Sequence, residues 1–116
     1  MKLTNYLLAT VLTFSCIGSF AQKQTINTKK STVKWLGEKI GGQHEGYINL
    51  KSGELEEKNN KIIAGTFAID MTSITNTDLT DPDYNQKLVE HLKSDDFFGV
   101  KKFPTASLTI TKATKF

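Results

Sequence analysis

Arginine is absent from this chain of 116 residues, and all 15 of its basic side chains are lysine. Without a guanidinium group, no side chain can hold a phosphate or a guanine through two parallel hydrogen bonds. The net charge of +3 is also small, although the sequence pI is about 9.0. Together these features argue against a nucleic-acid-binding protein.

Cysteine is almost as scarce, since Cys16 is the only one. A single cysteine excludes a disulfide framework within the chain and a zinc site built from several thiolates. The composition is otherwise that of a globular protein, with 38% hydrophobic and 23% charged residues, and the length suffices for one domain. The fold must therefore be held together by a small core without disulfides.

Residues 1–21 have the pattern of a secretory signal peptide. Lys2 supplies the positive start, and residues 6–14 form a short apolar run. Small residues at Ser19 and Ala21 favour cleavage after Ala21. We therefore expect an exported protein, periplasmic or secreted.

Two other interpretations of this segment are weaker. A membrane anchor would need about 20 apolar residues, and Lys23 ends the run too early. Lipidation at Cys16 would require a lipoprotein pattern that the preceding residues lack. The expected mature chain, residues 22–116, contains no cysteine and suits an oxidising compartment.

Alternating apolar and polar residues predict several β-strands in the mature chain. We expect strands over residues 32–36, 44–57 with a bend at 52–53, 62–71 and 105–111, the last pattern continuing in phase to Phe116. Residues 58–61 form a polar turn, and residues 38–42 and 72–80 are expected to be loops. The polar residues 22–30 are either a disordered lead or a sheet edge.

One helix is expected from Asp81-Pro82, with aspartate as the N-cap and proline at the first helical position. The helix should run to about Lys93, and residues 94–98 should begin a further helical turn. Its expected buried face has helical spacing and consists of Tyr84, Leu88, His91 and Leu92. The whole pattern predicts an all-β fold with one helical segment, in which the short turns favour antiparallel hairpins.

The two histidines, His44 and His91, lie far apart in the sequence. They would form a metal pair only if the fold brought them together with carboxylates, and no local spacing supports this. We favour structural roles, a hydrogen bond for His44 at the start of a strand and packing for His91 on the helix. The glycine-rich and nucleophile-elbow motifs of common enzymes are absent, so we expect no catalytic residue, metal or cofactor.

The apolar positions of the expected strands are in phase and should share one inner surface. That surface either fills a core or lines an apolar cavity, and the sequence leaves both alternatives open. Its members are Val33, Trp35, Ile48, Leu50, Phe67, Ile69, Leu108 and Ile110.

Taken in order, several segments resemble the YceI-like family, and the resemblance covers nearly all of residues 31–112. The opening segment is Trp35-Leu36-Gly37 followed by Gly42-x-His44-x-Gly46. The others are residues 50–55, 67–74, 88–98 and 103–108. Each segment alone is weak, but their order is specific.

The resemblance implies an exported, lipocalin-like antiparallel β-barrel that is not an enzyme. It also implies that a long-chain isoprenoid or other lipid binds in the apolar interior. The later strands of the family's domain are absent from this sequence, so we expect an incomplete barrel, with a homodimer as one way to complete it. By position, the implied ligand contacts are Trp35, His44, Ile48, Phe67, Ile69, His91, Leu108 and Ile110.

Two other functions stay open at this point. One is a stress-related or surface interaction module whose core is filled by side chains. The other is an enzyme that acts on a lipid or a quinone-like molecule. Lipid that copurifies with the protein favours the carrier, a solid core favours the interaction module, and turnover that depends on His44 favours the enzyme.

Overall fold

The computed structural model describes Gly18 and residues 20–114, so the predicted signal peptide lies almost entirely outside the described residues. In chain order the elements are β1 (Gln22–Thr25), the 3₁₀ helix η1 (Thr28–Lys30), β2 (Val33–Lys39), β3 (Gly42–Lys58), β4 (Lys61–Asp70), the 3₁₀ helix η2 (Met71–Ser73), α1 (Pro82–Lys93) and β5 (Thr105–Ile110). Among these described elements, no helix has the length and apolar character needed to cross a membrane.

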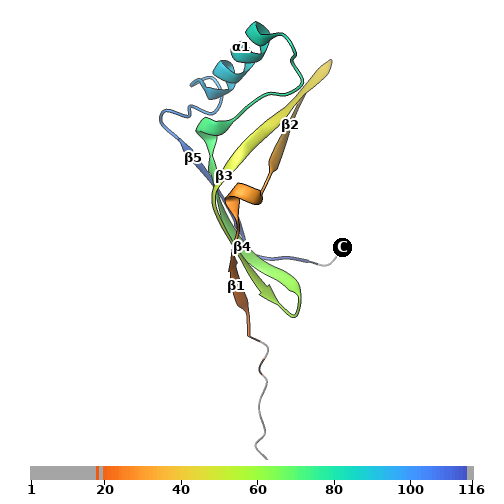
Figure 1. The fold of residues 1–116 in the computed structure, drawn as a ribbon, viewed down its shortest axis with the longest axis vertical. Helices are drawn as coiled ribbons and strands as arrows, with labels where there is room; N and C mark the ends of the chain where they lie inside the picture. The colour runs from red at the N-terminus through yellow and green to blue at the C-terminus, as the bar shows by residue number, and fades with distance from the viewer. Residues whose placement is uncertain (1–17, 19, 115–116) are drawn as a thin grey trace, which may run out of the picture.

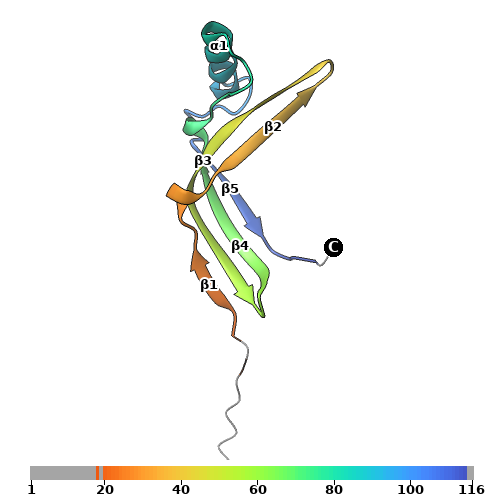
Figure 2. The same cartoon turned by 45° about the vertical axis from the view of Figure 1, so that its right-hand side comes forward.

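The described strands form one antiparallel sheet in the order β1-β3-β4-β5, and β2 also pairs with β3. β1 and β2 pair with different lengths of β3, at residues 54–57 and 42–48. Figures 1 and 2 show the sheet curling into a half-barrel, with α1 near its upper end beside the β2–β3 hairpin. The expected fold is confirmed as mostly β with one helix, and the half-barrel is consistent with an incomplete lipocalin-like barrel.

β1 decides between the two alternatives for residues 22–25 in favour of a sheet edge. Its four residues pair antiparallel with β3, so a disordered lead was wrong for this part. All four side chains of β1 are exposed. No apolar alternation could therefore distinguish this strand from a loop.

The β2–β3 hairpin is longer than the sequence pattern predicted. β2 continues to Lys39, and a tight turn with Gly41 at a φ of 84° replaces the expected loop. β3 is a single strand of 17 residues. A register shift between Leu50 and Ser52 marks a β-bulge close to the expected bend.

The other turn and strand predictions agree with the structure, except that Met71 and the start of the expected loop 72–80 form the 3₁₀ helix η2. Asn59 and Asn60 take positive φ values of 52° and 60° in the turn before β4. β4 and β5 lie where the alternation predicted them. The continuation of the pattern to Phe116 lies outside the described residues.

Helix α1 has the predicted start and end. The Asp81 carboxylate accepts hydrogen bonds from the backbone N–H groups of Asp83 and Tyr84 at 2.9 and 3.2 Å, and Pro82 occupies the first helical position. The further helical turn was wrong, because residues 95–98 form hydrogen-bonded turns instead.

The predicted buried face of α1 is only half correct. Leu88 and Leu92 are half-buried, but Tyr84 is 63% exposed and His91 is also exposed. The helix lies near the end of the half-barrel (Figure 1), so a narrow side of it reaches the sheet. His91 therefore lies at the margin of this contact.

Candidate functional site

The strand register places all the predicted inner-surface residues on one face of the sheet. Val33 is opposite Ile48, Leu50 is opposite Ile69, and Phe67 is opposite Leu108. Residues two apart on a strand share a face, which adds Trp35 and Ile110. We call this face, with Val33, Trp35, Ile48, Leu50, Phe67, Ile69, Leu108 and Ile110, the apolar face.

A small packed cluster covers the middle of the apolar face. Its buried members are Ile48, Met71, Ile74 and Val100, and the half-buried side chains of Val33, Trp35, Ile69, Leu92 and Ala106 pack against it. Ile48 and Ile69 thus lie inside the cluster, where they contribute to the core. Among the described residues no large side chain is fully buried, so this core is small.

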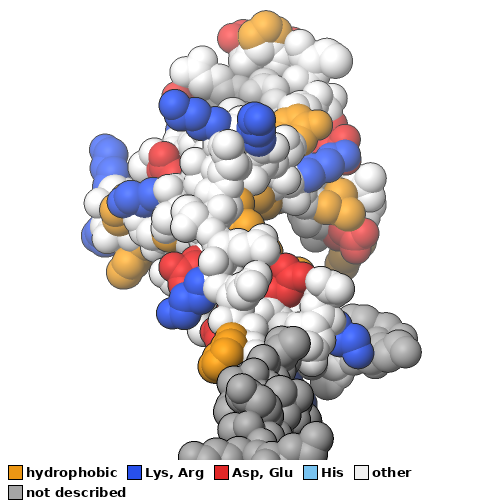
Figure 3. All heavy atoms as spheres, turned by 60° about the horizontal axis from the view of Figure 1, so that its bottom comes forward, with side chains coloured by type: hydrophobic (Ala, Val, Ile, Leu, Met, Phe, Trp, Pro, Cys, Tyr) orange, Lys and Arg blue, Asp and Glu red, His pale blue; other side chains and the backbone are white. Residues whose placement is uncertain are grey.

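The lower part of the apolar face is more open. Two glycines, Gly53 and Gly65, lie beneath Phe67: a Cβ atom on either would come within 3.0 or 3.3 Å of the phenylalanine ring. The ring is half-buried, while the neighbouring Leu108 is 54% exposed. Figure 3 shows hydrophobic side chains in a recess viewed from this lower end, with charged side chains around it.

A pocket of about 350 Å³ lies between α1 and the β2–β3 hairpin. It brings together three predicted site residues that are remote in sequence, Trp35, His44 and His91. Its lining is completed by Gly37, Glu38, Lys39, Leu88, Leu92 and Phe97. The Trp35 indole is fixed by a 2.8 Å hydrogen bond from its Nε1 to the Thr75 carbonyl.

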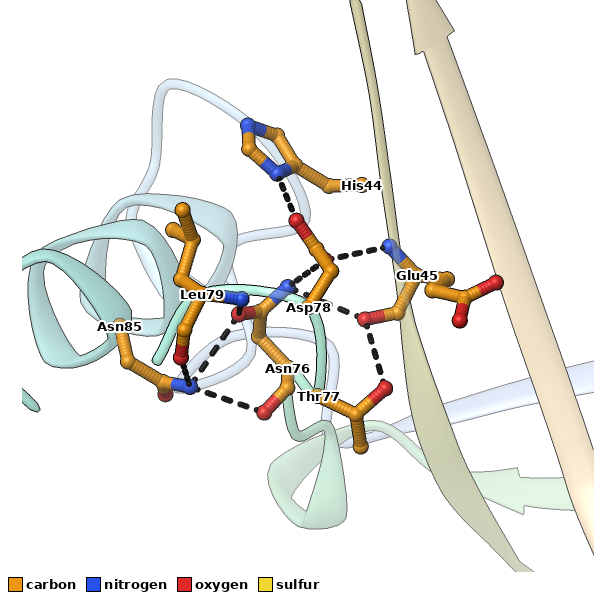
Figure 4. A network of polar contacts seen from close by, with 7 residues as sticks. All are labelled: His44, Glu45, Asn76, Thr77, Asp78, Leu79 and Asn85. Atoms are coloured by element: carbon orange, nitrogen blue, oxygen red, sulfur yellow. Dashed lines mark hydrogen bonds and ion pairs between the residues drawn. The ribbon is translucent and has the colours of Figure 1, made fainter. Parts of the chain in front are cut away.

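His44 is held in this pocket by a carboxylate from the loop after η2. Its Nδ1 lies 2.7 Å from Asp78 Oδ2, while the other Asp78 oxygen accepts a 2.8 Å hydrogen bond from the Glu45 backbone N–H (Figure 4). The predicted hydrogen bond of His44 is therefore present. Sequence reasoning missed its partner, Asp78.

The environment of Asp78 strongly favours the ionised carboxylate. The Glu45 N–H and then His44 lower the pKa of Asp78 from 3.8 to about 2, against a smaller opposing effect of desolvation. Asn76 also donates a hydrogen bond to this carboxylate. Asp78 is therefore a stable anion at neutral pH.

Asn76 connects the loop to both β3 and α1. Its Nδ2 donates to the Glu45 carbonyl at 3.0 Å, and its Oδ1 accepts from the Leu79 N–H at 3.1 Å and from Asn85 Nδ2 at 3.1 Å. Figure 4 shows these contacts converging on one buried side chain. The only sequence signal for this network was the run of Asn, Thr and Asp residues, which often bond to backbone groups in loops.

The loop lies directly on the upper half of β3. Thr75 and Thr77 donate backbone hydrogen bonds of 2.9 Å to the carbonyls of Tyr47 and Glu45. A Cβ atom at Gly46 would collide with the Thr75 carbonyl. Gly46 therefore permits the close approach that brings Asp78 to His44.

His91 forms part of the helical wall of the pocket. Its ring meets Phe97 edge to face with centroids 4.8 Å apart, and its Nε2 lies 3.6 Å from Asp96 Oδ2. Across the described residues, no group of three or more His, Cys, Asp or Glu side chains is arranged to hold a metal ion. The two histidines thus share an apolar pocket in which His44 has the better-defined partner.

A larger hollow of about 450 Å³ lies elsewhere, near β1, β3, β4 and β5. Most of its lining residues alternate with those of the apolar face, so they belong to the opposite, polar face. They include Thr25, Ser52, Glu54, Thr66, Ala68, Ser107 and Thr109. Gly53, Phe67 and Leu108 complete the lining, so the hollow also borders the open part of the apolar face.

The comparisons with known proteins agree with the geometry of the sheet. The YceI-like domain matches residues 24–116, which is most of the chain. No curated protein and no solved structure matches this chain. The YceI-like family is generally one of binding proteins, associated with lipids and polyisoprenoids, and not one of enzymes. The chain belongs to the YceI-like domain family.

Proposed function

We propose that this protein is an exported carrier that binds the long apolar chain of an isoprenoid or similar lipid. The observation that supports the proposal most strongly is the apolar face, which carries large hydrophobic side chains and is only partly covered by the packed cluster. Transfer of hydrocarbon from water onto such a face is favourable by about 25 cal/mol per Å² of apolar surface buried. Membership of a lipid-binding family points the same way.

The open part of the face around Phe67, Leu108 and Ile110 is the proposed site of the apolar chain. Phe67 is central, since its ring lies over two glycines that leave it room. Trp35, His44 and His91 belong to the separate pocket beside α1. Ile48 and Ile69 stabilise the cluster between these two parts of the face.

Export is the second component of the proposal. The N-terminal pattern supports it, and β1 begins at Gln22, directly after the proposed cleavage site. Cleavage after Ala21 would therefore leave every strand of the sheet intact. Sequencing of the N-terminus of exported protein should find Gln22, whereas an intact Met1 or a lipidated Cys16 would contradict this.

The binding site is tested by titrating the protein with a fluorescent long-chain fatty acid. Phe67→Asp places a carboxylate against hydrocarbon, at a cost of several kcal/mol unless it is protonated, and should abolish binding. Phe67→Leu keeps the site apolar and should weaken binding by up to about tenfold, equivalent to about 1.4 kcal/mol. Thr66→Asp is the matched control, because it makes the same charge change at the next residue on the polar face.

The possible results separate the site from the function. If wild type and Thr66→Asp bind saturably and both Phe67 variants bind as well, the apolar chain does not lie on this face. If the wild-type protein takes up no lipid at all, the carrier proposal fails.

A further inference from the structure

The pocket between α1 and the β2–β3 hairpin has features that the binding of a hydrocarbon chain does not explain. Its walls are mostly apolar, with Trp35, Leu88, Leu92 and Phe97, yet His44 reaches it with a side chain held by Asp78. Its volume of about 350 Å³ is at the lower end of the range for small-molecule sites. The packed cluster separates it along the strands from the open part of the apolar face.

The contact with Asp78 determines which nitrogen of neutral His44 carries the proton. An ionised carboxylate can only accept hydrogen bonds, so Nδ1, at 2.7 Å from Oδ2, must be the protonated nitrogen. The other nitrogen, Nε2, is then an acceptor with a free lone pair. Figure 4 shows it pointing away from Asp78 and from the rest of the network.

The hydrogen bonds to Asp78 make this proton position rigid. The carboxylate is oriented by two hydrogen bonds that it accepts, one from the Glu45 backbone N–H at 2.8 Å and one from the Asn76 side-chain amide. Asp78 also remains ionised at neutral pH, as its lowered pKa indicates. In its neutral form His44 is thus held as a hydrogen-bond acceptor facing a mostly apolar pocket.

We propose that this pocket binds an uncharged apolar alcohol, whose hydroxyl group donates a hydrogen bond to His44 Nε2. An aldehyde of the same shape has no hydrogen to donate and would leave the nitrogen unpaired. A carboxylate or phosphate would bring a negative oxygen toward the lone pair and the nearby Asp78 anion. The charged lining residues, Lys39 and Glu38, are of opposite sign and do not compensate for this. The His91 ring, also in the lining, is engaged with Phe97 and Asp96.

The test uses geraniol, geranial and geranic acid, which share one carbon skeleton and differ in the terminal group. Trp35 is the only tryptophan and lines the pocket, so its fluorescence reports binding there. The wild-type protein should bind geraniol about tenfold more tightly than geranial, and geranic acid more weakly still. Equal affinity for the alcohol and the aldehyde, or no saturable binding of geraniol, would overturn the proposal.

Asp78→Asn should reverse the role of His44 without removing its partner. The Glu45 N–H still requires an acceptor, so the new amide oxygen takes that place and the amide NH₂ group faces Nδ1. His44 must then accept at Nδ1 and carry its proton on Nε2. The preference for geraniol over geranial should fall to about unity, while the same exchange on the exposed start of α1, Asp83→Asn, should leave it unchanged.

Two further measurements keep the proposal testable if Asp78→Asn does not fold. Nitrogen NMR of the wild-type imidazole should show the His44 proton on Nδ1, and a proton on Nε2 would refute the argument. His44→Phe retains a ring of similar size but no acceptor, and it should also remove the preference for the alcohol. The carrier proposal does not depend on these results, because its fatty-acid titration concerns the Phe67 region.

Discussion

At the scale of single residues, the arrangement around β3 depends on Gly46. The Thr75 carbonyl lies so close to its Cα that a methyl group has no space, and the obstacle is backbone, which cannot rotate away. Gly46→Ala should therefore destabilise the protein by about 1–3 kcal/mol, as overpacking typically does.

Gly42, at the start of the same strand, provides the control for this substitution. A Cβ atom at Gly42 would meet only the end of the flexible Lys39 side chain, at 3.6 Å. In urea unfolding, Gly42→Ala should remain close to wild type. Equal stability of the two alanine variants would show that the loop does not need the close approach at Gly46.

Asp78 gives a pH dependence whose sign follows from its pKa. The folded-state pKa of about 2 is below the ordinary value of 3.8, so the ionised carboxylate stabilises the folded state. This contribution is complete above about pH 4 and is lost as the pH falls through about 2. The difference in unfolding free energy between wild type and Asp78→Asn should shrink over that interval, and a constant difference would contradict the assignment.

Residue roles were predictable only where they depend on local sequence. His44 was expected to make a hydrogen bond because it is a polar residue at the start of a strand. Its partner, Asp78, lies 34 positions away, and nothing in the alternation of β3 points to the loop that carries it. His91 was misplaced because helical spacing identifies a face but not how much of that face the sheet covers.

At the scale of secondary structure, the start of α1 depends on Asp81. Its carboxylate satisfies two N–H groups of the first turn, so Asp81→Ala should cost about 0.5–2 kcal/mol. Asp81→Ser retains a capping oxygen and should stay within a few tenths of a kcal/mol of wild type. Urea unfolding compares the two variants, and an equally large loss for serine would show that capping is not what the carboxylate provides.

Elements with strong internal patterns were predicted well. β4 and β5 alternate clearly, and Asp-Pro marks the beginning of α1. β1 has no apolar residue, so its pairing with β3 is determined by the rest of the sheet and not by its own sequence. The length of the β2–β3 hairpin was underestimated because glycines close to a turn read equally well as a loop.

At the scale of the whole molecule, the described sheet has free edges and a partly open apolar face. Within residues 20–114, β5 pairs only with β4, so its outer edge can accept a further strand from the same or a second chain. Unpaired edges promote association. We predict that residues 22–116 self-associate with rising concentration in sedimentation experiments, and a monomer that unfolds cooperatively at all concentrations would contradict this.

The curvature of the sheet could be predicted from the sequence mainly through its resemblance to the YceI-like family. Alternation showed that the hydrophobic residues share a face, but both a filled core and an open cavity satisfy that pattern. The difference lies in which loops cover the face. Here η2, the loop after it and Val100 cover the middle, and the region around Phe67 stays more open.

The central claim is that the apolar face binds a lipid, and one measurement tests it most directly. The protein is purified from its native compartment without detergent, and solvent extracts are analysed by mass spectrometry. We predict one long-chain apolar lipid in stoichiometric amount, reduced in the Phe67→Leu variant and unchanged in the Thr66→Asp control. Repeated extracts without stoichiometric lipid, from protein that also takes up none on titration, would contradict the claim and leave Phe67 as an ordinary packing residue.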